Sequence, residues 1–327
     1  MAGSATAPLA RAVTLSGGLG QIGSADNMQT LSNELSTLSN DANFPRTPSG
    51  LLPVGFGFLL FLADLEQAAA VLREHRPAVV WLFAARWTED YAAWAARARE
   101  ASPGCLVWVQ VGDVEGAVEV AREARPDVLC VQGADAGGHG LAKSAGLVAL
   151  LPEVREGLER EGLGEKVLLV GAGGVGDGRG VAAVLALGAE GVVMGTRFLG
   201  ARETVLHGGW REAVLRAKDG GRETVKSMLY DELRGPSIWP EGYDGRSVVN
   251  ESAKDFEKGV GIEQVRESFA EASKQDDRGY GPDGKARAPM WAGTGVGLVT
   301  REQSASEIVE EIRSGAVKAL EDAKARL

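Results

Sequence analysis

The sequence predicts an α/β fold, a TIM (β/α)8-type barrel, from three observations. Short apolar runs alternate with amphipathic or alanine-rich segments along the first two thirds of the chain, with a period of about 25 residues that is typical of βα units. Most of the expected strands are apolar almost throughout, as strands covered on both faces are. Glycine-rich segments follow three of these runs, and ligand sites of barrels lie at such strand ends.

The expected elements follow one another in alternation. The strands are residues 18–22, 52–58, 79–83, 106–111, 128–132, 167–170 and 191–196. The helices are residues 28–39, 65–74, 88–100, 114–124, 147–160 and 180–187, and a helix-like stretch at 8–16 precedes the first strand. Seven strands are one short of a closed barrel, which leaves two unpaired edges. We therefore expect the first barrel strand to be missing or truncated, with Met1 standing where that strand would end.

The βα rhythm stops after Phe198, and the rest of the chain divides into different segments. Residues 203–217 and 262–274 look helical, and 304–326 form an amphipathic helix that a capping box of Ser304 and Glu307 begins. Residues 220–295 are too long for a plain loop. We expect a barrel over 1–218, an inserted lid or side subdomain over 219–295, and a C-terminal helical segment over 296–327 that packs back on the barrel.

Composition excludes several classes of protein. The 327 residues include 35 Lys and Arg against 45 Asp and Glu, a net charge of −10, which argues against a nucleic-acid surface and favours a cytoplasmic protein. No apolar stretch has the length of a membrane span, and the start of the chain does not resemble a signal peptide. Cys105 and Cys130 lie in apolar runs and are expected to be buried structural thiols.

His139 is the main candidate for chemistry. It ends the segment V-Q-G-A-D-A-G-G-H over residues 131–139, directly after an apolar run. A satisfied structural histidine is the alternative interpretation, but the glycines beside it should shield it poorly, which favours a catalytic base. We expect His75 to be solvated at a helix end and His207 to be peripheral. Asp135 has no partner at ligand spacing, so no metal site is expected.

The segment from Gly171 to Gly176 formally matches G-x-G-x-x-G. The next strand ends in Met-Gly-Thr and carries no acid for a ribose, so a dinucleotide fingerprint is not supported. Two consecutive strands that end in Gly-Gly and Gly-Thr instead fit a phosphate cradle, with turn glycines as the alternative. No G-x-S-x-G nucleophile segment is present.

Three segments, 135–139, 171–175 and 194–198, together resemble the nitronate monooxygenase family, once called 2-nitropropane dioxygenases. Residues 16–23 are similar to a further segment of that family, and 230–235 and 291–299 resemble its fungal-type members. The resemblance implies noncovalent FMN, a nitronate or nitroalkane substrate, dioxygen, products that are a carbonyl compound and nitrite, and a possible homodimer. Flavin-dependent reductases share the barrel, so an NAD(P)H-dependent reductase of quinones or an enoyl thioester stays open, as does an inactive flavin-binding protein.

The resemblance also assigns roles to residues. His139 takes the position of the catalytic base. The residues that match the cofactor-binding positions are Ala2, Gly3, Gln110, Gln132, Gly137, Gly138, Gly171, Gly173, Gly174, Met194, Gly195 and Thr196. Among them, Gly173, Gly174, Gly195 and Thr196 match the phosphate site. Family members usually carry an apolar strand ending in Pro-Met before the pair that Ala2 and Gly3 match, which is the strand expected to be missing here.

Overall fold

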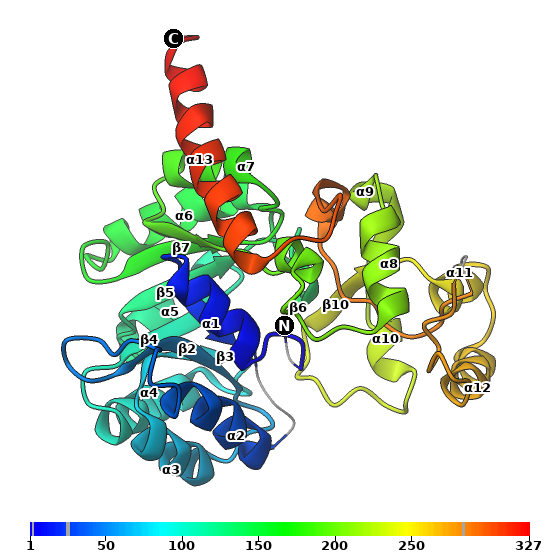
Figure 1. Ribbon diagram of the computed structural model, residues 1–327, viewed down its shortest axis with the longest axis horizontal. Coiled ribbons are helices and arrows are strands. Elements are labelled where there is room, and N and C mark those ends of the chain that lie inside the picture. The colour runs from blue at the N-terminus through cyan, green and yellow to red at the C-terminus, as the bar shows by residue number, and fades with distance from the viewer. Residues whose placement is uncertain (2, 24–26, 283–284) are drawn as a thin grey trace.

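A curled sheet of seven parallel strands forms the centre of the computed structural model, which describes residues 1, 3–23, 27–282 and 285–327 (Figure 1). The strands follow the order β1-β2-β3-β4-β5-β7-β8. Their bounds are β1 (Gly20–Ile22), β2 (Leu52–Leu59), β3 (Pro77–Phe83), β4 (Leu106–Val111), β5 (Val128–Gln132), β7 (Leu168–Ala172) and β8 (Gly191–Val193). No pairing joins β8 to β1 within the described residues, so the sheet is an open form of the predicted barrel.

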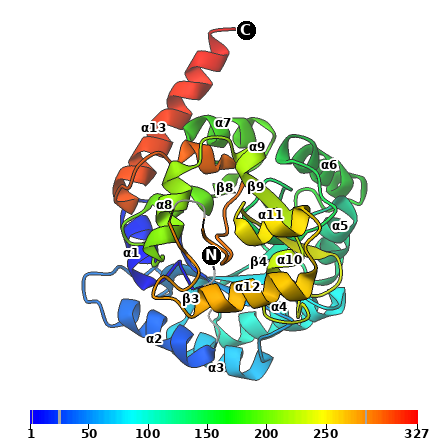
Figure 2. The same cartoon turned by 90° about the vertical axis from the view of Figure 1, so that its right-hand side faces the viewer.

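Helices cover the outer face of this sheet and form a ring in Figure 2. They are α1 (Ala7–Leu15), α2 (Met28–Ser39), α3 (Leu65–His75), α4 (Thr88–Ala101), α5 (Val114–Glu123), α6 (Leu147–Arg160) and α7 (Gly178–Ala186). Four of them begin at an Asn or Asp whose side chain accepts a hydrogen bond from a backbone N–H group of the first turn: Asn27, Asp64, Asp113 and Asp177. These caps satisfy donors that the helix cannot pair internally.

The alternation of strand side chains separates two apolar layers. Residues such as Leu82 and Val109 face the helices and belong to the main core. On the opposite face Cys130 and Val170 pack with Trp81 and Trp108, and this group fills the barrel interior. Apolar side chains therefore cover both faces of the curled sheet.

The predicted elements of the barrel are confirmed to within three residues at each end. The largest difference concerns β8, which ends at Val193 because residues from Thr196 onward form the 3-10 helix η1 (Thr196–Gly200). The predicted helix at 203–217 is wrong over its first turn. The helix α8 (Gly208–Arg216) begins only after His207, whose ring accepts the N–H of Gly209 at the helix start.

A second, antiparallel sheet lies beside the mouth of the barrel and was not predicted. Its order is β6-β10-β9, with β6 (Gly138–Leu141), β10 (Tyr243–Val248) and β9 (Thr224–Ser227). The helices around it are α9 (Gly220–Glu223), α10 (Leu229–Glu232), α11 (Glu251–Glu257) and α12 (Ile262–Ser273), and α12 confirms the predicted helix at 262–274. Because β6 follows β5 after five residues, this sheet joins residues 224–248 to the barrel directly at His139.

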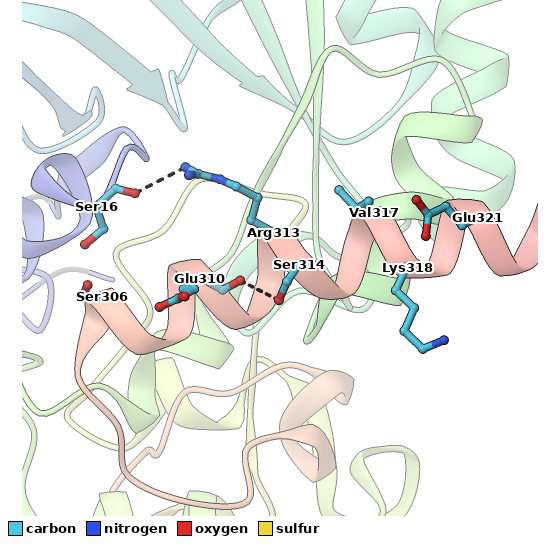
Figure 3. A pocket seen from close by; sticks show the side chains of 8 residues that line it. All are labelled: Ser16, Ser306, Glu310, Arg313, Ser314, Val317, Lys318 and Glu321. Carbon is cyan, nitrogen blue, oxygen red and sulfur yellow. Dashed lines mark hydrogen bonds between the residues drawn. The ribbon is translucent and has the colours of Figure 1, made fainter.

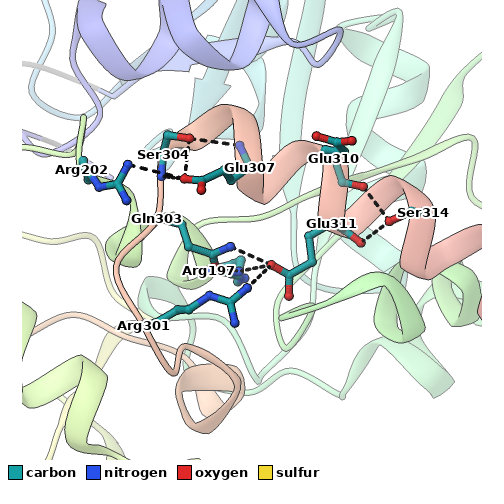
Figure 4. Close-up of polar contacts among 9 residues, drawn as sticks. All are labelled: Arg197, Arg202, Arg301, Gln303, Ser304, Glu307, Glu310, Glu311 and Ser314. Atoms are coloured by element: carbon teal, nitrogen blue, oxygen red, sulfur yellow. Dashed lines mark hydrogen bonds and ion pairs between the residues drawn. The ribbon is translucent and has the colours of Figure 1, made fainter.

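The chain closes with η2 (Thr294–Leu298) and α13 (Ala305–Lys324), which packs against α7 and α1 and then extends beyond the barrel (Figure 1). The predicted capping box of Ser304 and Glu307 is confirmed. Figure 4 shows how the start of α13 is held: the buried Arg197 donates to Gln303 Oε1 at 2.6 Å and to Glu311 Oε2 at 3.4 Å. No helix in the described part of the chain has the length and apolar character that a membrane span needs.

Candidate active site

His139 is enclosed, and the prediction that its neighbouring glycines leave it poorly shielded is wrong. Its Nε2 lies 2.6 Å from Oδ1 of Asp231, on α10. The two side chains are 13% and 7% exposed. The shielding comes from groups distant in the sequence, which the local pattern of glycines could not indicate.

Aromatic rings supply most of this enclosure. The ring of Trp239 stacks on the imidazole with centroids 3.8 Å apart and planes at 10°. Trp291 approaches at 4.7 Å with tilted planes. Trp239 also contacts Phe61, which follows β2, at 4.8 Å, and Tyr243 at 5.9 Å. The histidine is therefore packed among aromatic rings, which limit the access of water and strengthen its electrostatic interactions.

The partner strand leaves room for this arrangement. Gly245 on β10 lies opposite His139 in the antiparallel register. A Cβ atom at Gly245 would lie 2.4 Å from Trp291 Cζ3 and 3.3 Å from His139 Nε2. A side chain here would displace the indole, so the glycine is required for both rings to occupy their positions.

The loop between β5 and β6 is fixed by polar contacts at several points. Gln132 donates from Nε2 to the carbonyl oxygen of His139 at 3.1 Å. Thr294 donates from its hydroxyl to Asp135 Oδ1 at 2.9 Å, and Arg246 donates to the carbonyl oxygen of Ala134. Asp135 is thus part of the loop's internal bonding, and the described residues contain no cluster of three or more His, Cys, Asp or Glu that could hold a metal.

The glycine-rich ends of β5, β7 and β8 converge on this loop. Gly173 and Gly174 have φ values of +106° and +75°, which favour glycine. Cβ atoms there would lie 2.9 Å from the carbonyl oxygen of Gly133 and 3.0 Å from Asp135 Cβ. Thr196 Oγ1 accepts a hydrogen bond from the N–H of Gly293 at 2.9 Å. The predicted phosphate segments therefore lie together and close to the loop that carries His139.

The remaining predicted cofactor residues divide by what surrounds them. Gly3 and Gly138, with φ of +68° and +72°, have no atom within 4 Å of an added Cβ, and the nearest atom at Gly195 is Met1 Sδ at 3.7 Å. Gln110, at the end of β4, and Met194, after β8, are half-buried.

Two predicted glycines face protein instead. An added Cβ at Gly137 would lie 2.4 Å from the backbone of Ala292 and Gly293, and one at Gly171 would lie 2.6 Å from Val184 on α7. Ala2 lies outside the described residues.

Comparison with known proteins identifies the family to which this arrangement belongs. The family model for nitronate monooxygenase matches residues 66–315. The chain belongs to the nitronate monooxygenase family. It is 43% identical to nitronate monooxygenase npaC of Metarhizium robertsii, with 94% of this chain and 87% of that protein covered. It is 39% identical to nitronate monooxygenase of Neurospora crassa, with 95% and 86% covered.

Solved structures support the same fold for this member of the nitronate monooxygenase family. FabK from Thermotoga maritima superposes with a TM-score of 0.76 and 25% identity, over 100% of this chain and 94% of that one. Nitroalkane oxidase from Streptomyces ansochromogenes gives a TM-score of 0.75 with 22% identity, over 98% and 94% of the two chains. The second similarity concerns the fold alone.

Sequence reasoning missed Asp231, Trp239 and Trp291, which surround the histidine of this nitronate monooxygenase family member. Two of them carried a signal, because Asp231 lies in segment 230–235 and Trp291 opens segment 291–299, both of which resemble fungal-type members. Trp239 lies in a Gly- and Pro-rich stretch without periodicity, and nothing in that pattern indicated its contact with His139.

The other histidines have structural surroundings. His75 is 5% exposed, and its Nε2 lies 2.9 Å from Ser32 Oγ of α2. The prediction that it is solvated is therefore wrong, because α2 covers the end of α3; burial lowers the pKa of His75 below its usual 6.5. His207 stacks on Tyr280 at 4.7 Å and remains peripheral.

Both cysteines are buried, as predicted. Burial raises the pKa of Cys105 to about 11 and also raises that of Cys130. Neither thiol is therefore activated as a nucleophile near neutral pH.

A surface hollow of about 620 Å³ lies elsewhere, between α1 and α13 (Figure 3). Its walls include Ser16, Glu310, Arg313 and Lys318. None of the residues that line this hollow is among the predicted site residues. It therefore belongs to the outer helical layer and not to the barrel mouth.

Proposed function

We propose that this chain is an FMN-dependent oxidoreductase that converts alkyl nitronates, and nitroalkanes, with dioxygen into carbonyl compounds and nitrite. The observation that carries the proposal is the enclosed His139 on β6, in the segment that follows β5, beside the converging glycine-rich ends of β7 and β8. Family membership supports nitronates as the substrate class. The aromatic rings around His139 support a substrate with an apolar part.

The residues present fit a flavin mononucleotide. Gly138 and Gly195 leave open space where side chains would otherwise project. Gly173, Gly174, Gly195 and Thr196 would hold the single phosphate through backbone N–H groups and a hydroxyl. Inside the barrel, the indole N–H groups of Trp81 and Trp108 lack a partner among the described residues, which leaves donors for a polar ligand or for water.

Further contacts to the ring system would come from Gln110, Gln132 and Gly138, and from the backbone of Gly137. The absence of a second nucleotide fingerprint in the sequence favours FMN over FAD. When bound, FMN supplies the redox chemistry, taking electrons from the nitronate and passing them to dioxygen.

His139 would act on the neutral form of the substrate. It removes the proton from the carbon that carries the nitro group, and the electron pair of that C–H bond moves into the C=N bond of the nitronate. A nitronate has already lost this proton, so it does not need the base. The aromatic walls of Trp239 and Trp291 would keep water from the histidine during this step.

We also propose a cytoplasmic location, which the acidic composition supports, and a homodimer as the assembly to be tested. The partners of the reaction are then a small nitro compound and dioxygen. Size-exclusion chromatography with light scattering measures the assembly independently of the activity.

The experiment combines flavin identification with turnover of both substrate forms. Chromatography of the denatured supernatant should show FMN, and air-saturated assays with ethylnitronate should give nitrite and acetaldehyde. FAD, or no flavin after reconstitution with excess FMN, would overturn the cofactor assignment. Absence of nitrite from flavin-loaded protein would overturn the reaction.

The variant His139→Asn tests the base. It should retain flavin and lose about 10² to 10⁴ in turnover of nitroethane, with a much smaller loss on ethylnitronate. His207→Asn is the matched control, because asparagine can replace the histidine as the cap of α8. Equal losses on both substrates in His139→Asn would show a positioning role instead of a base.

A further inference from the structure

The carboxyl group of Asp231 contacts the imidazole of His139. Its Oδ1 lies 2.6 Å from His139 Nε2, and its side chain is 7% exposed. Its Oδ2 is buried and lacks a hydrogen-bond partner among the described residues. A buried acid with so few partners is costly unless one strong interaction offsets the loss of water, and in the described part of the chain that interaction is the contact with the imidazole.

The surrounding residues fix the direction of this contact. Trp239 stacks flat on the imidazole, and Gly245 has no side chain that would displace Trp291 or crowd Nε2. Tyr230, the neighbour of Asp231 on α10, donates its hydroxyl to the carbonyl oxygen of Val248 at 3.2 Å. The helix that carries the acid is thereby attached to β10, the strand opposite His139.

We propose that Asp231 is a positioning residue that selects the reactive tautomer of His139. This inference rests on the proposed function, because it presupposes that the histidine removes a proton. A neutral imidazole carries one N–H and one basic nitrogen. With the N–H of Nε2 directed to the acid, the lone pair lies on Nδ1, which is the nitrogen that receives the substrate proton.

His139 and Asp231 have separate roles in the proton transfer. The C–H bond beside the nitro group breaks, the proton forms a new bond to Nδ1, and the electron pair forms C=N while the negative charge moves to the nitro oxygens. The imidazolium that results lies against the carboxylate of Asp231. The acid stabilises this cation without taking the proton itself, as the aspartate of a hydrolase triad does.

The kinetic test uses Asp231→Asn, Asp231→Glu and the control Glu232→Gln. The control removes the adjacent acid on α10, which does not contact His139 in the structure. Asp231→Asn should lower kcat for nitroethane by about 10²-fold or more while changing kcat for ethylnitronate by less than about threefold, since only the neutral substrate needs the base. Asp231→Glu should recover part of this loss, and Glu232→Gln should match the unmodified protein on both substrates.

Nitrogen-15 NMR of the three histidines reads the tautomer without any turnover. His139→Asn identifies the signals of His139, which should place the proton of the neutral ring on Nε2 and not on Nδ1. Asp231→Asn should abolish this preference, whereas Glu232→Gln should preserve it. A preference for the Nδ1–H tautomer in the unmodified protein would overturn the proposal.

Two kinetic results for Asp231→Asn would contradict the positioning role of the acid. A rise in nitroethane turnover in Asp231→Asn would mean that the acid holds the base in an inactive state, and equal losses on both substrates would mean that it only supports the fold. Both results contradict the proposal. If the unmodified protein oxidises neither substrate, the proposed function fails, while the NMR result still decides whether Asp231 sets the tautomer.

Discussion

The side-chain amide of Gln132 donates a hydrogen bond to the carbonyl oxygen of His139, with Nε2 and O 3.1 Å apart. Gln132 is the last residue of β5, and His139 lies on β6. A Cβ at Gly140 would lie 2.4 Å from Oε1 of the same amide, so the glycine makes room for it. One side chain of the barrel thus supports the backbone of the candidate base.

Gln132→Leu should weaken this connection. It preserves the approximate volume but leaves the carbonyl oxygen of His139 without its donor, which costs about 1–3 kcal/mol of unfolding free energy. Urea unfolding of flavin-free protein measures this. Gln29→Ala is the control, because its contact with Asn33 is exposed and surface changes stay within about 0.5 kcal/mol. Equal effects in the two variants would contradict a supporting role for Gln132.

Gly174→Ala should reduce FMN affinity by at least about tenfold, equivalent to about 1.4 kcal/mol. Its φ is +75°, and the new Cβ would lie 3.0 Å from Asp135 Cβ, so both the loop and its neighbour would have to move. Gly162→Ala is a matched control, with φ of +66° and nothing within 4 Å of the added Cβ. It should lose about 1 kcal/mol of stability from backbone strain and bind FMN normally. Equal dissociation constants for FMN in the two variants would contradict a phosphate site at Gly174.

Gly178→Ala should separate α13 from α7. The added Cβ would lie 2.4 Å from the backbone nitrogen of Ala316 and 2.4 Å from the carbonyl carbon of Gly315, and backbone cannot rotate away as a side chain can. The overpacking should cost about 3 kcal/mol and speed tryptic cleavage within α13. Gly208→Ala, where nothing lies within 4 Å, should leave both measurements unchanged. Unaltered proteolysis of Gly178→Ala would mean that α13 is held by other contacts.

Stability should depend on pH through His75. Burial lowers its pKa in the folded state below the usual 6.5, so the unfolded chain binds its proton more readily. The contribution of neutral His75 to the free energy of unfolding is complete above about pH 6.5. It is lost as the pH falls through the folded pKa, and the free energy changes by at most about 1.4 kcal/mol per pH unit. His75→Gln should therefore lose less stability than the unmodified protein between pH 7 and 5.5. Parallel urea midpoints for the two proteins would contradict this assignment.

The sequence predicted the barrel well because its signals are local. The apolar runs at 106–111 and 128–132 match β4 and β5 at both ends, and Ser304 begins α13 as its capping box indicates. These features depend on side-chain periodicity and on caps within a few residues, which a single sequence displays.

The surroundings of His139 were not predictable in the same way. The residue was identified from its segment, but its contacts come from Asp231 and Trp239, about 90 to 100 positions later in the chain. The strands β9 and β10 are short, and β10 contains Gly245 and charged residues, so neither shows an apolar alternation. Their pairing with β6 is a long-range property that local patterns do not encode.

The most direct test of nitronate oxidation by this protein is the anaerobic reduction of the bound flavin. Flavin-loaded protein is mixed without oxygen with ethylnitronate and, in a separate sample, with NADH, and the visible absorbance is followed. We expect ethylnitronate to bleach the flavin within the turnover time and NADH not to bleach it. When air is admitted, the oxidised spectrum should return and nitrite should be released. Bleaching by NADH together with no response to ethylnitronate would contradict nitronate oxidation and identify a flavin reductase.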